Sequence, residues 1–279
     1  MTLAMHPTTF AAIGRFVARP SHAVLITGAT GIGKSCIAEM LATQILKLQE
    51  NALEQYPYLR RIRSDDNKAI SIEPIRLLEH FLSLKVPGTA TVKRVIIIEQ
   101  SQLLTIEAQN ALLKTLEEPP EDTVLILTAP TSASLLPTIQ SRLQVLSVVL
   151  PSKEAVQAAM PSTTFDSLYA ISGGLPGLLH ALVYDETHPL SEAVQVARSL
   201  LAQSSYERLL QVDFLAKDKA LAKNTLTILQ QMAHISLQTA SGAASKRWQT
   251  ILSASYSAAE ALEANGNAKL VLANAFLRL

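Results

Sequence analysis

The sequence predicts an α/β domain built on a parallel sheet, followed by an all-helical region. Over the first 150 residues, continuous apolar runs rich in β-branched residues alternate with helical patterns. Such runs are typical of strands covered by helices on both faces, because a strand with one solvent face alternates apolar and polar residues. A glycine-rich motif separates the first run from the first helical pattern, and the strand pattern ends at Pro151.

Four short runs predict the strands of the sheet. In chain order they are AVLIT at 23–27, RVIIIE at 94–99, TVLILTA at 123–129 and VLSVVL at 145–150. Beyond them, Ala, Leu, Ser and Gln recur at helical spacing, with breaks at Gly173–Gly174, Pro176, 185–189 and Gly242. We therefore expect an α/β domain over residues 1–150, a small helical domain over 151–187 and a helical bundle over 188–279.

Composition narrows the class of protein. With 279 residues, 48% hydrophobic and 17% charged, the chain can form two or three globular domains. A net charge of +1 gives no global sign of nucleic-acid binding. Cys36 is the single cysteine, which excludes a disulfide framework and a cysteine zinc site. No run approaches the ~18 apolar residues of a membrane span, and the N-terminus lacks a signal-peptide pattern. We expect a cytoplasmic protein without membrane contact.

The glycine-rich motif GATGIGKS matches the phosphate-loop pattern G-x-x-x-x-G-K-[ST] and lies between a predicted strand and a predicted helix. Its glycines allow a tight curl in which consecutive N–H groups and the helix N-terminus face an anion. Lys34 is placed to reach the β- and γ-phosphates, and the Ser35 hydroxyl to ligate Mg²⁺. The motif predicts binding of ATP or ADP with Mg²⁺ by Gly28, Ala29, Thr30, Gly31, Ile32, Gly33, Lys34 and Ser35.

From Arg94 onward the sequence resembles the bacterial clamp-loader AAA+ family, which comprises the DNA polymerase III delta-prime and gamma/tau subunits. The resemblance rests on NALLKTLEEPP at 110–120, ILT at 126–128 and LLPTIQSR at 135–142. ISIEPIR at 70–76, ISGGLPG at 171–177 and EANGNAKLVL at 263–272 resemble further blocks of the family. Together they cover most of the chain.

This resemblance implies an AAA+ P-loop NTPase domain with a RecA-like parallel sheet, a small helical lid and a C-terminal all-α collar. In this family the collar assembles subunits into a five-membered ring. The implied partners are the gamma/tau and delta subunits of a hetero-pentamer, the sliding clamp, and primed DNA through the complex. The implied role is loading of the clamp in replication.

The family pattern also fixes the second nucleotide motif, whose Asp-Glu pair falls on Glu99–Gln100. Glu99 is expected to serve Mg²⁺, whereas the amide of Gln100 cannot accept a proton at neutral pH. Loss of a general base typically costs ~10²–10⁴-fold in rate. Binding with weak or no intrinsic ATPase activity is therefore expected, with Thr128 in the sensor position. A strand end that never meets nucleotide is the plainer interpretation of Glu99–Gln100.

Ser141–Arg142 match the start of the family's Ser-Arg-Cys motif, with Leu143 in place of the cysteine. The resemblance implies that Arg142 reaches a neighbouring subunit's site, where such a finger supplies ~10³–10⁵-fold in related enzymes. An ordinary surface arginine is the alternative. The lid stretch GGLPGLLHAL lacks an arginine for the γ-phosphate, and no zinc-binding cysteines are present, which favours the delta-prime type.

Two other roles are compatible with the sequence. One is a gamma-like ATPase motor of the same loader, which would need Glu99 or another group as base. The other is a nucleotide-free structural ring subunit with a relict phosphate loop. Five basic residues could line a channel facing duplex DNA or be ordinary surface charge: Arg60, Arg61, Arg63, Lys93 and Arg94.

Overall fold

The computed structural model describes residues 4–49, 52–64, 68–161, 165–184 and 189–279. By its internal contacts the chain divides into two compact units, Met1–Val156 and Gln157–Leu279. The division falls within helix α6 (Lys153–Ala159), a few residues beyond the predicted end of the α/β domain.

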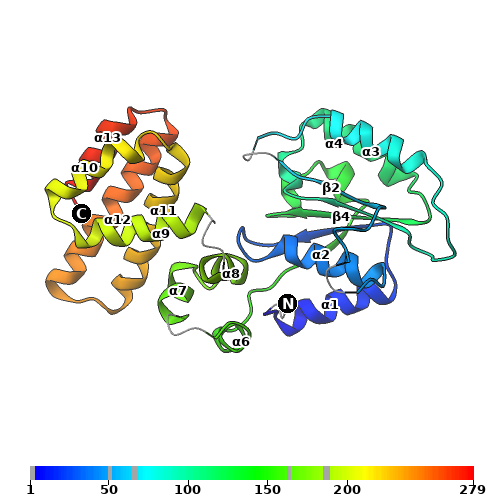
Figure 1. Ribbon diagram of the computed structural model, residues 1–279, viewed down its shortest axis with the longest axis horizontal. Coiled ribbons are helices and arrows are strands. Elements are labelled where there is room, and N and C mark those ends of the chain that lie inside the picture. The colour runs from blue at the N-terminus through cyan, green and yellow to red at the C-terminus, as the bar shows by residue number, and fades with distance from the viewer. Residues whose placement is uncertain (1–3, 50–51, 65–67, 162–164, 185–188) are drawn as a thin grey trace. The chain divides into compact units, whose positions relative to one another are not determined.

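A five-stranded sheet forms the centre of the first unit (Figure 1). Its strands lie in the order β2-β3-β4-β1-β5, and every neighbouring pair is parallel. They are β1 (Ala23–Thr27), β2 (Leu59–Ile62), β3 (Arg94–Ile98), β4 (Thr123–Ala129) and β5 (Gln144–Ser147). The fold class is confirmed: a parallel sheet of the P-loop NTPase type precedes a helical region.

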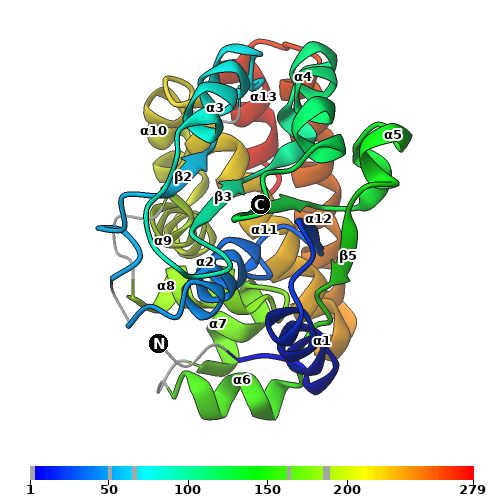
Figure 2. The same cartoon turned by 90° about the vertical axis from the view of Figure 1, so that its right-hand side faces the viewer.

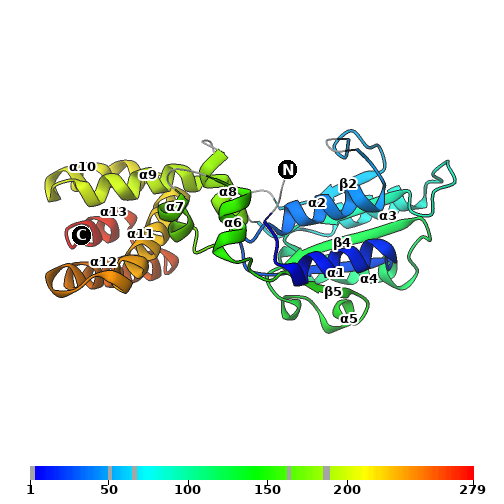
Figure 3. The same ribbon diagram turned by 90° about the horizontal axis from the view of Figure 1, so that it is seen from below.

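Helices cover both faces of the sheet. Helices α1 (Pro7–Ala18) and α2 (Lys34–Ile45) lie on one face, and α3 (Glu73–Ser83) and α4 (Ile106–Glu117) on the other (Figures 1 and 3). The short helix α5 (Pro137–Gln140) lies beside β5 at one edge (Figure 2). Two one-turn 3₁₀ helices, η1 (Ser101–Leu103) and η2 (Ser132–Ser134), complete the unit.

Side-chain alternation along the strands divides the core of this unit into two layers. Leu25, Ile96 and Leu125 point to the layer of α3 and α4. Their neighbours Val24 and Ile97 point to the layer of α1 and α2. Successive residues of a strand face opposite sides, so continuous apolar runs are needed to fill both layers.

The second unit is helical. After α6 it contains α7 (Phe165–Ile171), α8 (Pro176–Tyr184), α9 (Pro189–Ala202), α10 (Ser205–Leu215), α11 (Lys219–Thr239), α12 (Gly242–Glu263) and α13 (Ala268–Phe276). One apolar cluster joins Ile171 of α7 with residues of α9 to α13. The predicted boundary between lid and collar, at 187/188, lies outside the described residues, so the three-part division stays a prediction. Among the described residues, no helix is long and apolar enough to cross a membrane.

Candidate nucleotide site and an exposed arginine

The phosphate loop connects the carboxyl end of β1 to the amino end of α2. Gly31 and Gly33 have φ angles of 85° and 98°, in the left-handed region that favours glycine. Gly33 is the N-cap of α2, and its carbonyl accepts the N–H of Ile37 at 3.0 Å. The unpaired N–H groups of the first helical turn therefore begin directly at the loop, as an anion site requires.

Lys34 closes the loop on itself. Its Nζ donates to the carbonyl oxygens of Gly28 and Ala29 at 2.7 and 2.9 Å. Partial burial lowers the pKa of the Lys34 ammonium below its ordinary value. An ammonium carries three N–H donors. Two carbonyl contacts thus fix its position at the mouth of the loop and leave one donor for an anion held by the loop backbone.

Ser35 and Glu99 meet across the sheet. The Ser35 hydroxyl donates to Glu99 Oε2 at 2.7 Å, although the two residues are 64 positions apart. Glu99 follows β3, and its N–H donates to the Ile62 carbonyl at 2.8 Å, which holds the turn after the strand. A hydroxyl and a single carboxylate at a phosphate loop fit the donor set of Mg²⁺, which binds few protein groups and keeps waters and phosphate oxygens.

Within the described part of the chain, no other group of side chains is a candidate metal site. Among the described residues, His, Cys, Asp and Glu side chains nowhere gather in groups of three or more that could hold a metal ion. Cys36, the single cysteine, follows the loop directly, and burial, then Glu39 and Glu99, raise the pKa of its thiol. A neutral, partly buried thiol is a packing group here.

Gln100 and Thr128 form a further contact at the carboxyl ends of the strands. Gln100 has a φ of 50° in the left-handed region, an uncommon conformation for a residue other than glycine. Its N–H donates to Thr128 Oγ1 at 3.0 Å. Thr128 lies on the central strand β4 and is buried. The structure therefore places Thr128, the predicted sensor, against the backbone of Gln100, the residue expected to stand in place of the general base.

Arg142 lies at the amino ends of the strands, opposite the carboxyl ends where the phosphate loop begins. It precedes β5, whose residues Gln144 and Ser147 pair with Val24 and Thr27 of β1. The phosphate loop follows the far end of β1, so the length of a five-residue strand, ~16 Å at ~3.3 Å per residue, separates the two. Arg142 therefore cannot serve the phosphate loop of its own chain.

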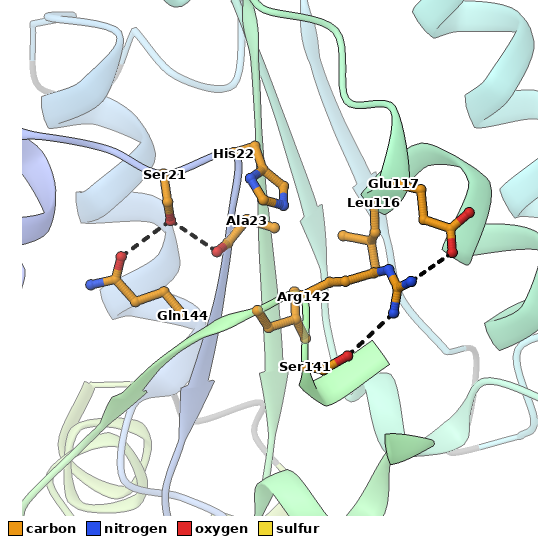
Figure 4. Close-up of a pocket in the computed structure, with 9 residues that line it drawn as sticks. Ser21, His22, Ala23, Leu116, Glu117, Ser141, Arg142 and Gln144 are labelled. Atoms are coloured by element: carbon orange, nitrogen blue, oxygen red, sulfur yellow. Dashed lines mark hydrogen bonds and ion pairs between the residues drawn. The ribbon is translucent and has the colours of Figure 1, made fainter. Parts of the chain in front are cut away.

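The Arg142 guanidinium is held at the surface (Figure 4). Its Nη2 donates to Glu117 Oε1 at 2.8 Å, and its Nη1 donates to the Thr138 carbonyl at 2.8 Å and to Ser141 Oγ at 3.2 Å. The side chain is 35% exposed. It lines an open cleft of about 550 Å³ together with Ser21, His22, Ala23, Leu116, Glu117, Ser141, Leu143 and Gln144.

Most of the basic residues considered for a DNA-facing channel make contacts within the chain. Arg94 is buried: its Nη1 donates to the carbonyls of Leu82 and Leu84, and its Nε and Nη2 donate to Asp122 Oδ1. Arg61 pairs with Glu39. Arg94 is thus a structural residue, and the channel interpretation is wrong for it.

Arg60 and Lys93 also make contacts within the chain. The Arg60 guanidinium lies 4.2 Å from the centroid of the Phe81 ring. Lys93 Nζ donates to the Val86 carbonyl at 3.2 Å. A cation over an aromatic ring is an attractive arrangement that does not exclude solvent. Arg60 is exposed and Lys93 is partly buried, and the channel interpretation stays a prediction for both.

The family described as "DNA polymerase III, delta subunit" matches residues 17–151. The delta-prime subunit of DNA polymerase III from Pseudomonas aeruginosa is 33% identical over 221 residues, covering 67% of this chain and 66% of that protein. The same subunit from Haemophilus influenzae is 30% identical over 146 residues, covering 48% of this chain and 44% of that protein. The chain thus spans no more than two thirds of these relatives.

A solved structure supports the fold. A DNA polymerase III gamma subunit-related protein from Thermotoga maritima superposes with a TM-score of 0.60 at 21% identity, over 96% of this chain and 97% of that one. At this identity the similarity concerns the fold alone.

Proposed function

Since the chain belongs to the clamp-loader AAA+ family, with DNA polymerase III delta-prime subunits as relatives, we propose that it is a ring subunit acting mainly on its neighbour. It binds ATP or ADP with Mg²⁺ in its own loop and supplies Arg142 to the nucleotide of the next subunit. Its partners are gamma/tau and delta subunits, and the assembled ring loads the sliding clamp on primed DNA.

The observation that carries this proposal is the position of Arg142. Its exposed guanidinium lies at the amino ends of the strands, a strand length away from the phosphate loop of the same chain. It can therefore contact a triphosphate only if that triphosphate is bound to another subunit. A guanidinium binds phosphate oxygens with two parallel hydrogen bonds and stabilises the charge that develops as the γ-phosphoryl group is transferred.

At the chain's own loop the residues favour binding over turnover. Backbone N–H groups and Lys34 hold the phosphates, and Ser35 with Glu99 would hold Mg²⁺, which neutralises phosphate charge when bound. The amide of Gln100 does not take a proton from an attacking water. The contact between Ser35 and Glu99 also favours the gamma-like alternative, because it keeps the metal-binding half of the motif.

The test is hydrolysis by the assembled ring. We expect Arg142→Ala to lower ATPase activity of the complex by at least ~10³-fold at the neighbouring site, with ring assembly unchanged. Glu99→Ala in this subunit is expected to have a much smaller effect. A gamma-like motor would show the reverse pattern. A nucleotide-free subunit would give no heat with Mg²⁺·ATP in calorimetry, and Lys34→Ala would change nothing.

A further inference from the structure

The ion pair between Arg142 and Glu117 joins the proposed finger to the last residue of α4. A guanidinium has five N–H donors, and three are used by Glu117, Thr138 and Ser141. Of these three acceptors, only the Glu117 carboxylate carries a charge. Two donors remain, but a phosphate that used them would meet a guanidinium whose positive charge is still offset by Glu117.

The pair is solvent-accessible and lies in the cleft at the amino ends of the strands. The exposed fractions of the two side chains are 35% for Arg142 and 51% for Glu117. In Figure 4 the guanidinium extends across the cleft toward the Glu117 carboxylate. Exposed ion pairs are weak, because water and salt screen them. This one can therefore be separated by a stronger anion without disturbing the fold.

We propose that Glu117 is a latch that restrains Arg142 until a triphosphate on the neighbouring subunit displaces it; this inference rests on the proposed trans role of Arg142. While Glu117 stays paired, its negative charge largely cancels the positive charge that Arg142 offers to a phosphate. A γ-phosphate carries more charge than a carboxylate and accepts two parallel N–H bonds, so it competes effectively. A diphosphate lacks that group and leaves the latch closed. Glu117 is thus a positioning residue that makes finger engagement depend on a neighbouring triphosphate.

Glu117→Gln removes the charge and keeps the shape. Glu118→Gln is the matched control, because Glu118 is the next residue, is also exposed, and forms no hydrogen bond or ion pair with Arg142. Thermal unfolding should be the same for both variants and the parent chain. Any difference between them then reports the ion pair and not the fold.

The first measurement uses the full-length chain alone. Phenylglyoxal forms its adduct with guanidinium nitrogens, and the hydrogen bond to Glu117 Oε1 occupies one of those of Arg142, Nη2. We expect Arg142 to react two- to fivefold faster in Glu117→Gln than in Glu118→Gln, measured by mass spectrometry of the peptide that contains residue 142. That range corresponds to about 0.4 to 1 kcal/mol. Equal rates in the two variants overturn the latch.

The second measurement uses the assembled ring. Glu117→Gln should raise ATP hydrolysis two- to fivefold, and Glu118→Gln should leave it unchanged. In an Arg142→Ala background the Glu117→Gln effect should disappear. A slower ring with Glu117→Gln would mean that Glu117 supports the finger, which overturns the latch and leaves the finger intact. If Arg142→Ala does not slow the ring, the proposed function fails and the latch with it.

Discussion

The buried pair of Arg94 and Asp122 provides a quantitative test of how the site is held in place. Arg94 begins β3, the strand that delivers Glu99 to the phosphate loop, and its side chain is 5% exposed. It binds Asp122 at 2.6 Å and three carbonyls at the end of α3, from Phe81, Leu82 and Leu84. Replacing Asp122 by Asn keeps an acceptor but leaves a buried, uncompensated guanidinium.

Removal of one partner from a fully buried pair typically costs ~3–5 kcal/mol. The Asp122 side chain is 22% exposed, so water reaches part of the site. The α3 carbonyls also remain in place as acceptors. We therefore expect Asp122→Asn to destabilise the first unit by about 2 to 3 kcal/mol, below the fully buried range. Glu121→Gln, an exposed neighbour on the same turn, should change stability by less than ~0.5 kcal/mol.

Hydrogen exchange of the β3 amides is the suitable assay. Trp248, the single tryptophan, lies in α12 of the second unit, so its fluorescence does not report on the first. A loss of 2 to 3 kcal/mol should raise exchange of residues 95–98 by about 30- to 150-fold at neutral pH. Exchange in Asp122→Asn that matches Glu121→Gln would refute the reasoning.

The difference in stability between the parent chain and Asp122→Asn should change with pH in one direction. Burial raises the pKa of Asp122, but its hydrogen bonds to Arg94 and Thr123 and the Arg94 charge outweigh that effect and hold the pKa below its ordinary value of 3.8. A carboxyl with a depressed pKa in the folded state stabilises it fully above the unfolded pKa. The gap between parent and Asp122→Asn should stay constant from neutral pH to about pH 5 and shrink as pH falls below 3.8.

Three further outcomes follow from the structure. Phosphates favour the protonated ammonium of Lys34, and burial lowers the pKa of this ammonium below 10.5. As pH rises, nucleotide affinity measured by calorimetry should therefore start to fall before pH 10.5 is reached. The weaker binding of Lys34→Ala should not vary over the same range. Gln100→Glu should restore a general base and raise single-turnover hydrolysis of bound ATP by about 10²-fold; unchanged turnover with intact binding would show that this side chain does not face the attacking water. Ser204→Ala removes a side-chain cap of α10 and should cost the second unit about 1 kcal/mol in urea unfolding followed by Trp248 fluorescence, whereas Ser241→Ala, at a helix start without a side-chain cap bond, should have little effect.

Three strands, β1, β3 and β4, could be predicted from the sequence because each is a continuous apolar run that is buried at every position. The run 145–150 predicted a fourth strand only in part: β5 spans Gln144–Ser147 at the edge of the sheet, and three of its four residues are exposed. The fifth, β2, was missed for a physical reason. It is an edge strand of four residues, LRRI, in which only Leu59 and Ile62 are buried. Two arginines in the middle break the apolar pattern that a central strand needs.

The site was predictable to the extent that its residues belong to local motifs. The contact between Ser35 and Glu99 could be predicted because the two motifs follow the carboxyl ends of strands in one parallel sheet. The pairs Arg94–Asp122 and Arg142–Glu117 join residues 28 and 25 positions apart, which no periodicity or spacing relates. Glu117 in particular belongs to a run of acids before two prolines, a pattern that indicates only the end of a helix.

In the proposed function the two ends of the strands have separate tasks, which would explain how a phosphate loop can be useful beside Gln100 in place of a general base. A ligand that binds the folded state alone stabilises it by RT ln(1 + [L]/Kd), or about 4 kcal/mol at a concentration 1,000 times Kd. A nucleotide that binds at Lys34 and Ser35 but turns over slowly remains as such a ligand, bridging α2 to β3 through Glu99. Its effect would be to stiffen the scaffold, whereas the chemistry of the ring would depend on Arg142 at the other end. Loss of nucleotide from this subunit should therefore lower its thermal stability more than it changes the contribution of Arg142 to its neighbour.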